Sequence, residues 1–142
     1  MCIRDRNEGN RCERGAYRLK AAEGDRKVIL ISTGSELQLA VDVAAKLEEQ
    51  GIGVDVISMV CTELFDAQPK EYKEDILPNV DPGSILRVSI EAGTTFGWER
   101  YTMLNGLNIG LDRFGASAPI DDLMEKFGFT VEAIVPQILE RI

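Results

Sequence analysis

Histidine is the most informative absence in this sequence, because none of the 142 residues is a histidine. Without an imidazole, the chain cannot build a Ser-His-Asp or Cys-His catalytic centre, nor a zinc site that relies on histidine ligands. Catalysis by this chain alone would have to use carboxylates, lysine, tyrosine or a cofactor.

Cysteines and long apolar runs are also scarce. The three cysteines, Cys2, Cys12 and Cys61, form no Cys-x-x-Cys pair. Their odd number is atypical of a disulfide-stabilised secreted domain and predicts a reducing compartment, the cytoplasm. No apolar run approaches the ~20 residues of a membrane-spanning helix. The polar and charged start does not have the pattern of a signal peptide.

Positive charge is under-represented, since 16 basic residues face 24 acidic ones and the net charge is −8. The basic residues are scattered and form no long stripe. This balance argues against nucleic acid and anionic membranes as partners. We interpret the acidic excess as a solvated surface.

The chain is long enough for one domain with a substantial core. Residues 1–14 are strongly charged and have no apolar periodicity. We predict that they form a disordered or non-native leader, and that residues 15–142 form a single α/β domain.

The most structured pattern lies between Val28 and Ser58 and predicts strand, turn, helix and strand. The first strand, Val28–Ile31, is apolar on both faces, which is typical of the middle of a parallel sheet covered on both sides. Ser35-Glu-Leu-Gln38 matches a capping box at a helix start, and Gly51 fits the left-handed position that ends a helix.

Further along, strands alternate with helices, and this alternation predicts a three-layer α/β domain with right-handed crossovers. An edge strand at 16–20 would pair antiparallel and make the sheet mixed. Pro136 interrupts the last amphipathic pattern, so we expect a kink or a late start there. The other predicted elements are strands at 52–59, 84–90 and 107–111, and helices at 62–66, 70–76, 119–127 and 131–142, with one more ending near 104.

Two glycine turns follow strand ends, where open α/β sheets usually bind ligands. The first contains Gly34 and Ser35, which could offer backbone N–H groups to an anion at a helix start. It lacks the glycine spacing of dinucleotide and P-loop sites, so a plain turn with a helix cap is the simpler interpretation. The second contains Glu91 and Gly93, where the carboxylate could act as a base or accept from a substrate hydroxyl, or could accept from loop amides.

Aromatic residues are few, 6% of the chain, and three lie close together at Phe96, Trp98 and Tyr101. Aromatic side chains bury large areas and often anchor subunit contacts, so we favour a core or interface role over ligand stacking. Gly34, Ser35, Glu91, Gly93 and Trp98 are therefore the candidate residues for a ligand crevice or an interface.

Several segments, taken in order, resemble the C-terminal domain of transketolase over residues 15–142. They are Gly15-Ala-Tyr17, Ile31-Ser-Thr-Gly-Ser-Glu-Leu37, Val56-Ile-Ser-Met59, Thr62-Glu-Leu-Phe-Asp-Ala-Gln68, Ile76-Leu-Pro78, Ser89-Ile-Glu-Ala-Gly93, Gly97-Trp-Glu-Arg-Tyr101, Phe114-Gly-Ala-Ser-Ala-Pro119 and Phe127-Gly-Phe-Thr130. The resemblance implies a three-layer α/β/α domain with a five-stranded, mixed and mostly parallel sheet.

The resemblance also implies a role. Transketolases transfer a ketol unit between sugar phosphates in the pentose phosphate pathway, using thiamine diphosphate and a divalent metal, Mg or Ca. Their cofactor lies between the other two domains of a homodimer, and their catalytic histidines lie there as well. The resemblance therefore assigns this chain no catalytic, cofactor-binding or metal-binding residue. Its expected partners are the remaining transketolase domains and a second subunit, with sugar phosphates bound by the full enzyme.

Two other hypotheses remain open. The chain could be the C-terminal domain of a related thiamine diphosphate enzyme, a deoxyxylulose-phosphate synthase or a 2-oxoacid dehydrogenase, which share the fold. The two glycine turns also allow a stand-alone regulatory module that binds a small ligand.

Overall fold

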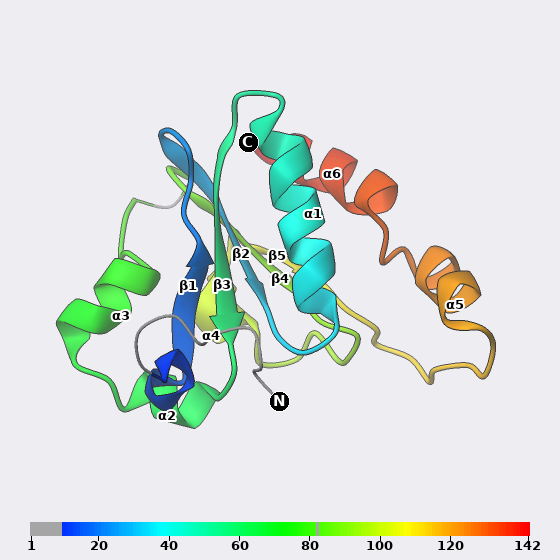
Figure 1. Ribbon diagram of the computed structural model, residues 1–142, viewed down its shortest axis with the longest axis horizontal. Helices are drawn as coiled ribbons and strands as arrows, with labels where there is room; N and C mark the ends of the chain where they lie inside the picture. Colours follow the sequence, from blue (N-terminus) through cyan, green and yellow to red (C-terminus); the bar gives the residue numbers. More distant parts are fainter. Residues whose placement is uncertain (1–9, 82) are drawn as a thin grey trace.

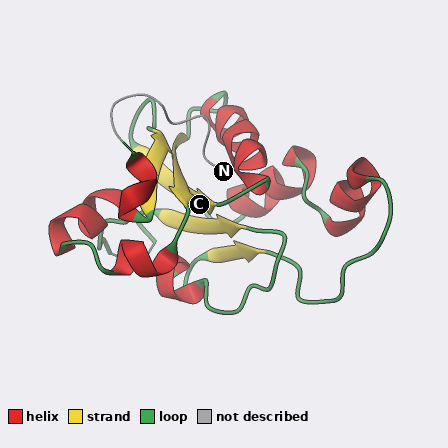
Figure 2. Cartoon of the chain, turned by 60° about the horizontal axis from the view of Figure 1, so that its bottom comes forward, coloured by secondary structure: helices red, strands yellow, loops and turns green. Residues whose placement is uncertain are grey.

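The computed structural model describes residues 10–81 and 83–142, and these form a five-stranded sheet between two layers of helices (Figures 1 and 2). The strand order is β1-β3-β2-β4-β5. Strand β1 pairs antiparallel with β3, and the other neighbouring strands are parallel. The strands are β1 (Ala16–Lys20), β2 (Arg26–Ser32), β3 (Gly53–Met59), β4 (Leu86–Ile90) and β5 (Leu107–Ile109). The predicted mixed α/β sheet and its antiparallel edge strand are confirmed.

One helical layer covers each face of the sheet. On one face, side chains of α1 (Glu36–Glu48) and α6 (Val131–Leu139) are buried against Val28, Leu30 and Val56, and α5 (Ile120–Phe127) lies at the margin of this cluster. On the other face, α2 (Thr62–Asp66), α3 (Lys70–Ile76) and α4 (Glu99–Thr102) each contribute a buried side chain against Ile29, Ile31 and Ile57. Alternate residues of β2 and β3 thus serve two cores, which explains why these strands are apolar on both faces.

The first helix begins differently from the prediction. Ser35 lies at the helix start but makes no side-chain capping bond, and its Oγ donates instead to Oε1 of Glu36 at 2.7 Å. Its backbone is already helical, whereas a capping residue has extended angles. The predicted capping box is therefore wrong. Gly51 has φ +80° and closes the helix end as predicted.

The predicted leader overlaps a short ordered turn. Arg11–Arg14 form a 3-10 helix, η1, that the sequence pattern did not indicate. The guanidinium of Arg14 lies over the ring of Tyr72, 4.7 Å from its centroid. Residues 1–9 of the predicted leader lie outside the described residues.

Several elements are shorter than predicted, including α6, which ends at Leu139 instead of at residue 142. Strand β4 begins at Leu86, and α4 ends at Thr102. Strand β5 ends at Ile109. Beyond it, the Leu111 N–H donates to the carbonyl of Gly93, which lies in the loop after β4. The last helix, α6, begins at Val131 without the expected delay, and Pro136 lies inside it.

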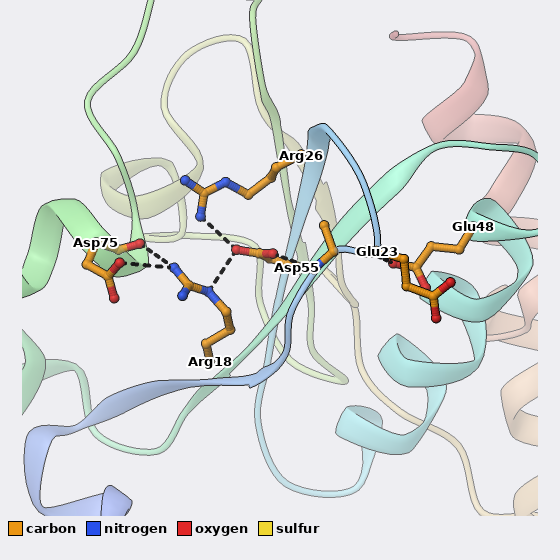
Figure 3. Close-up of polar contacts among 7 residues, drawn as sticks. Arg18, Glu23, Arg26, Glu48, Asp55 and Asp75 are labelled. Carbon is orange, nitrogen blue, oxygen red and sulfur yellow. Dashed lines mark hydrogen bonds and ion pairs between the residues drawn. The ribbon is translucent and has the colours of Figure 1, made fainter.

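A buried carboxylate ties the β1–β2 turn to the sheet (Figure 3). Asp55 of β3 is 3% exposed and accepts hydrogen bonds from Arg18 Nε at 2.9 Å and from an Arg26 guanidinium nitrogen at 2.7 Å. Its other oxygen accepts from the Ala22 N–H at 2.8 Å. The charge of Asp55 is therefore compensated, as burial of a carboxylate requires.

We find no helix among the described residues that combines the length and the apolar composition needed to span a lipid bilayer.

Candidate functional site

The carboxyl ends of β2 and β4 meet at the point where the strand order reverses. From β2 the chain crosses through α1 to β3 on one side, and then returns to place β4 on the other side of β2. The two strand ends are joined by the Ser32 hydroxyl, which donates to the carbonyl of Ile90 at 2.7 Å. Such a reversal is where open α/β sheets bind ligands, because the two following loops diverge and leave a crevice.

A cavity of about 650 Å³ opens beside this point. Its walls come from the loop after β4, from α4 and from the start of α2. Glu91, Gly93 and Trp98, three of the five predicted candidates, line it together, and Thr62, Phe96, Arg100 and Tyr101 are among the other lining residues.

The aromatic residues of the predicted cluster differ in burial. Trp98 and Tyr101 meet edge to face, with ring centroids 6.1 Å apart, and Tyr101 also contacts Phe65 in the core. Tyr101 is 7% exposed and its hydroxyl donates to Asp66. Burial and the Asp66 charge raise the pKa of Tyr101. Phe96, by contrast, is 87% exposed, so unlike Tyr101 it is not part of the core.

Glu91 is the unusual group of this cavity. Its backbone N–H donates to the Ile109 carbonyl at 3.0 Å, which fixes the residue at the strand end. Its half-buried carboxylate has no hydrogen-bond or ion-pair partner among the described residues. Burial raises the pKa of Glu91, and the nearby charge of Glu36 adds to the effect. The alternative that Glu91 accepts from loop amides is therefore wrong for this structure.

Gly34 and Ser35 are placed elsewhere. Both are exposed, neither lines the cavity, and Gly34 has φ +60° with no atom within 4 Å of the place where a Cβ would lie. The structure therefore brings three of the five candidates together and leaves the other two on the neighbouring turn.

Two residues near the cavity were not singled out from the sequence. Arg100 lines the wall and pairs with Asp66 at 3.0 Å. Glu36 is 8% exposed and acts on Glu91 through its charge. A signal was available for Glu36, because it lies four residues after the end of β2, at the start of α1, and the carboxyl ends of parallel strands share one edge of the sheet.

The described residues supply no site for a divalent metal. Within residues 10–81 and 83–142, no three histidine, cysteine, aspartate or glutamate side chains lie close enough to hold one ion. The groups present at the cavity do not fit the metal-bound diphosphate that the resemblance implies for a full enzyme.

Comparison with known proteins identifies the family. The model of the transketolase-like TK C-terminal domain matches residues 15–130. The chain belongs to the transketolase family. The matched range includes all five candidate residues and both glycine turns.

Individual transketolases resemble most of this chain but are much longer. The chloroplastic transketolase of Craterostigma plantagineum is 49% identical over 132 residues, which cover 92% of this chain and 25% of the relative. That of Solanum tuberosum is 53% identical over 108 residues, covering 76% and 14% respectively. The solved transketolase from Leishmania mexicana superposes with a TM-score of 0.79 at 42% identity, covering 90% of this chain and 18% of that one. The chain thus spans a quarter or less of these relatives.

Proposed function

We propose that this chain is the C-terminal domain of a transketolase that moves ketol units between sugar phosphates with thiamine diphosphate and a divalent metal. The observation that carries the proposal is the family match over residues 15–130 together with 49% identity across 92% of the chain. The same identity supports transketolase over the related thiamine diphosphate enzymes. The cofactor and sugar phosphates would be held by other domains.

Within that enzyme, the domain's role is structural support of the assembled subunits. Phe114 is 96% exposed and Ile120 of α5 is 67% exposed, and α5 has no buried residue of its own. Two large apolar side chains exposed to this extent within seven residues of chain support a surface that another protein part covers. We assign this surface to contacts with the remaining domains or the second subunit. Location in the cytoplasm stays a prediction from the cysteine pattern.

A ketol-transfer assay tests the proposal directly. The purified chain, mixed with xylulose 5-phosphate, ribose 5-phosphate, thiamine diphosphate and Mg²⁺, is expected to form no sedoheptulose 7-phosphate. Added to a transketolase truncated before its C-terminal domain, it is expected to raise activity or dimer content. Product formation by the chain alone would contradict the assignment of the catalytic groups to other domains.

A matched pair of variants tests the surface. Phe114→Ser is expected to weaken this rescue, while Leu104→Ser, which changes an equally exposed apolar residue after α4, should leave it unchanged. Equal rescue by both variants and the parent chain would contradict a contact through the α5 segment.

A further inference from the structure

We propose that the cavity beside Glu91 binds an organic cation, with an ammonium group held between the Glu91 carboxylate and the aromatic wall formed by Trp98 and its neighbours. The inference stands independently of the proposed transketolase role, since it concerns a pocket contained in this chain. It starts from the Glu91 carboxylate, which has no partner within residues 10–81 and 83–142 and lies where the strand order reverses.

The charges of the cavity select for a cation. Glu91 brings a negative charge that no described side chain compensates, and the Glu36 carboxylate acts on it from the next strand end. Among the described residues of the wall, the one cation is Arg100, which is paired with Asp66 at 3.0 Å and whose side chain is 69% exposed. An incoming ammonium group would therefore meet uncompensated negative charge, whereas a phosphate would be repelled.

The wall selects for an organic rather than a hydrated inorganic cation. Phe96, Trp98 and Tyr101 line the same cavity as Glu91. The faces of aromatic rings attract alkylammonium groups by cation–π interaction, and the rings also pack against the methylene or methyl carbons of such groups. A space of about 650 Å³ admits a group of this size.

The same chemistry is carried by a free metabolite with an ammonium group and by a lysine side chain of another protein segment. Choline represents the first source and Nα-acetyl-lysine amide the second. The neutral carbon isostere of choline, in which carbon replaces the quaternary nitrogen, has the same shape without the charge. Comparing these three probes separates charge recognition from simple apolar filling.

The chain provides its own optical probe, because Trp98 is its single tryptophan. We expect choline or the lysine model to change Trp98 fluorescence with a saturable dependence in the millimolar range, about 4 kcal/mol of binding free energy. Isothermal calorimetry gives the same constants independently of any optical change. Binding by choline alone assigns the site to a free cation, and binding by the lysine model alone assigns it to a protein side chain.

Two variants with the same charge change make the test specific. Glu91→Gln keeps the side-chain shape and is expected to weaken binding about tenfold or more. Glu71→Gln, on the exposed start of α3 and outside the cavity, should leave binding unchanged. Circular dichroism confirms that both variants are folded. Absence of saturation for both cations, equal binding by Glu91→Gln, or equal binding of the neutral isostere would each overturn the proposal.

Discussion

At the scale of single residues, Glu91 shows how a potential binding group can lower the stability of its own fold. Burial raises its pKa, and the charge of Glu36 adds to this shift. The folded chain therefore holds a proton on Glu91 more tightly than the unfolded chain does. By linkage, ionised Glu91 lowers the free energy of unfolding, and this loss grows as the pH rises through the folded pKa.

We accordingly predict that Glu91→Gln increases the free energy of unfolding at pH 7, and that the gain shrinks as the pH is lowered toward 4. Urea titrations of both proteins at several pH values measure this difference. A variant that is less stable at pH 7, or whose gain is the same at every pH, would show that Glu91 has a stabilising partner in solution.

Gly15 is a second residue whose role is set by its surroundings. It has φ +80°, and its carbonyl accepts from the N–H groups of Val60 and Cys61 at 2.7 and 2.8 Å. A Cβ at this position would lie 2.3 Å from both the Cys61 carbonyl oxygen and the Phe65 nitrogen. The close approach of backbone to backbone requires glycine.

Gly15→Ala is therefore expected to lower the free energy of unfolding by about 3 kcal/mol or more, because backbone must shift in a strained conformation. Gly24→Ala is the matched control, since a Cβ there meets no atom within 4 Å. The control should change stability by less than about 1 kcal/mol in either direction. Similar losses in thermal or urea unfolding for both variants would count against this account.

Asp55 provides the third prediction at this scale. Asp55→Asn removes the charge that Arg18 and Arg26 both contact, and leaves them against a neutral amide (Figure 3). We expect a loss of about 2–4 kcal/mol, at the lower end of values for broken buried pairs because both arginines are about a quarter exposed. Asp75→Asn, the exposed partner of Arg18 at 3.4 Å, should cost less than about 1 kcal/mol. Equal costs measured by urea unfolding would contradict a special role for the buried carboxylate.

At the scale of elements, α6 contains a proline that its packing tolerates. Pro136 is exposed and lies in the interior of Val131–Leu139, between the buried Val135 and Ile138. The ring removes one N–H donor from the helix, and the apolar face that α6 presents to the sheet offsets this loss. Tertiary packing thus overrides a local preference.

Pro136→Ala is expected to raise the free energy of unfolding by about 1–3 kcal/mol, because alanine restores the missing hydrogen bond and removes no buried contact. Gln137→Ala, a change at the next exposed position, should alter stability by less than about 0.5 kcal/mol. Thermal unfolding of the three proteins distinguishes the effects. Destabilisation by Pro136→Ala would mean that the proline ring has a packing role.

The sequence predicts elements well where two independent signals agree. In β2 the apolar residues on both faces indicated a central strand, and in α1 the stop at Gly51 indicated the end of the helix, and both were correct. The capping box failed because the pattern at Ser35 does not reveal that its backbone is already helical. The 3-10 turn at Arg11–Arg14 has no apolar periodicity, and it is held by contacts with residues far along the chain, such as Tyr72.

Contacts between residues far apart in the chain also limit what the sequence predicts about the site. Glu91, Gly93 and Trp98 could be placed together because they follow one strand within eight residues. Thr62, which lines the cavity, and Glu36, whose charge acts on Glu91, follow other strands. Placing them beside Glu91 requires knowledge of the strand order. Whether a carboxylate has a partner depends on the loops around it, which a single sequence specifies least.

At the scale of the whole molecule, the strand order has a consequence for the time course of folding. The hydrogen bond that joins β2 to β4, from Ser32 to Ile90, spans 58 residues of chain. A ribosome adds about 5–20 residues per second, so β2 waits about 3–12 s for its second neighbour during synthesis. Until β3 is complete at Met59, both edges of β2 are open, and one edge then stays open until β4 is complete at Ile90. Contacts of such separation form late and slowly, so the centre of this sheet is the part most exposed to wrong pairing while the chain is being made.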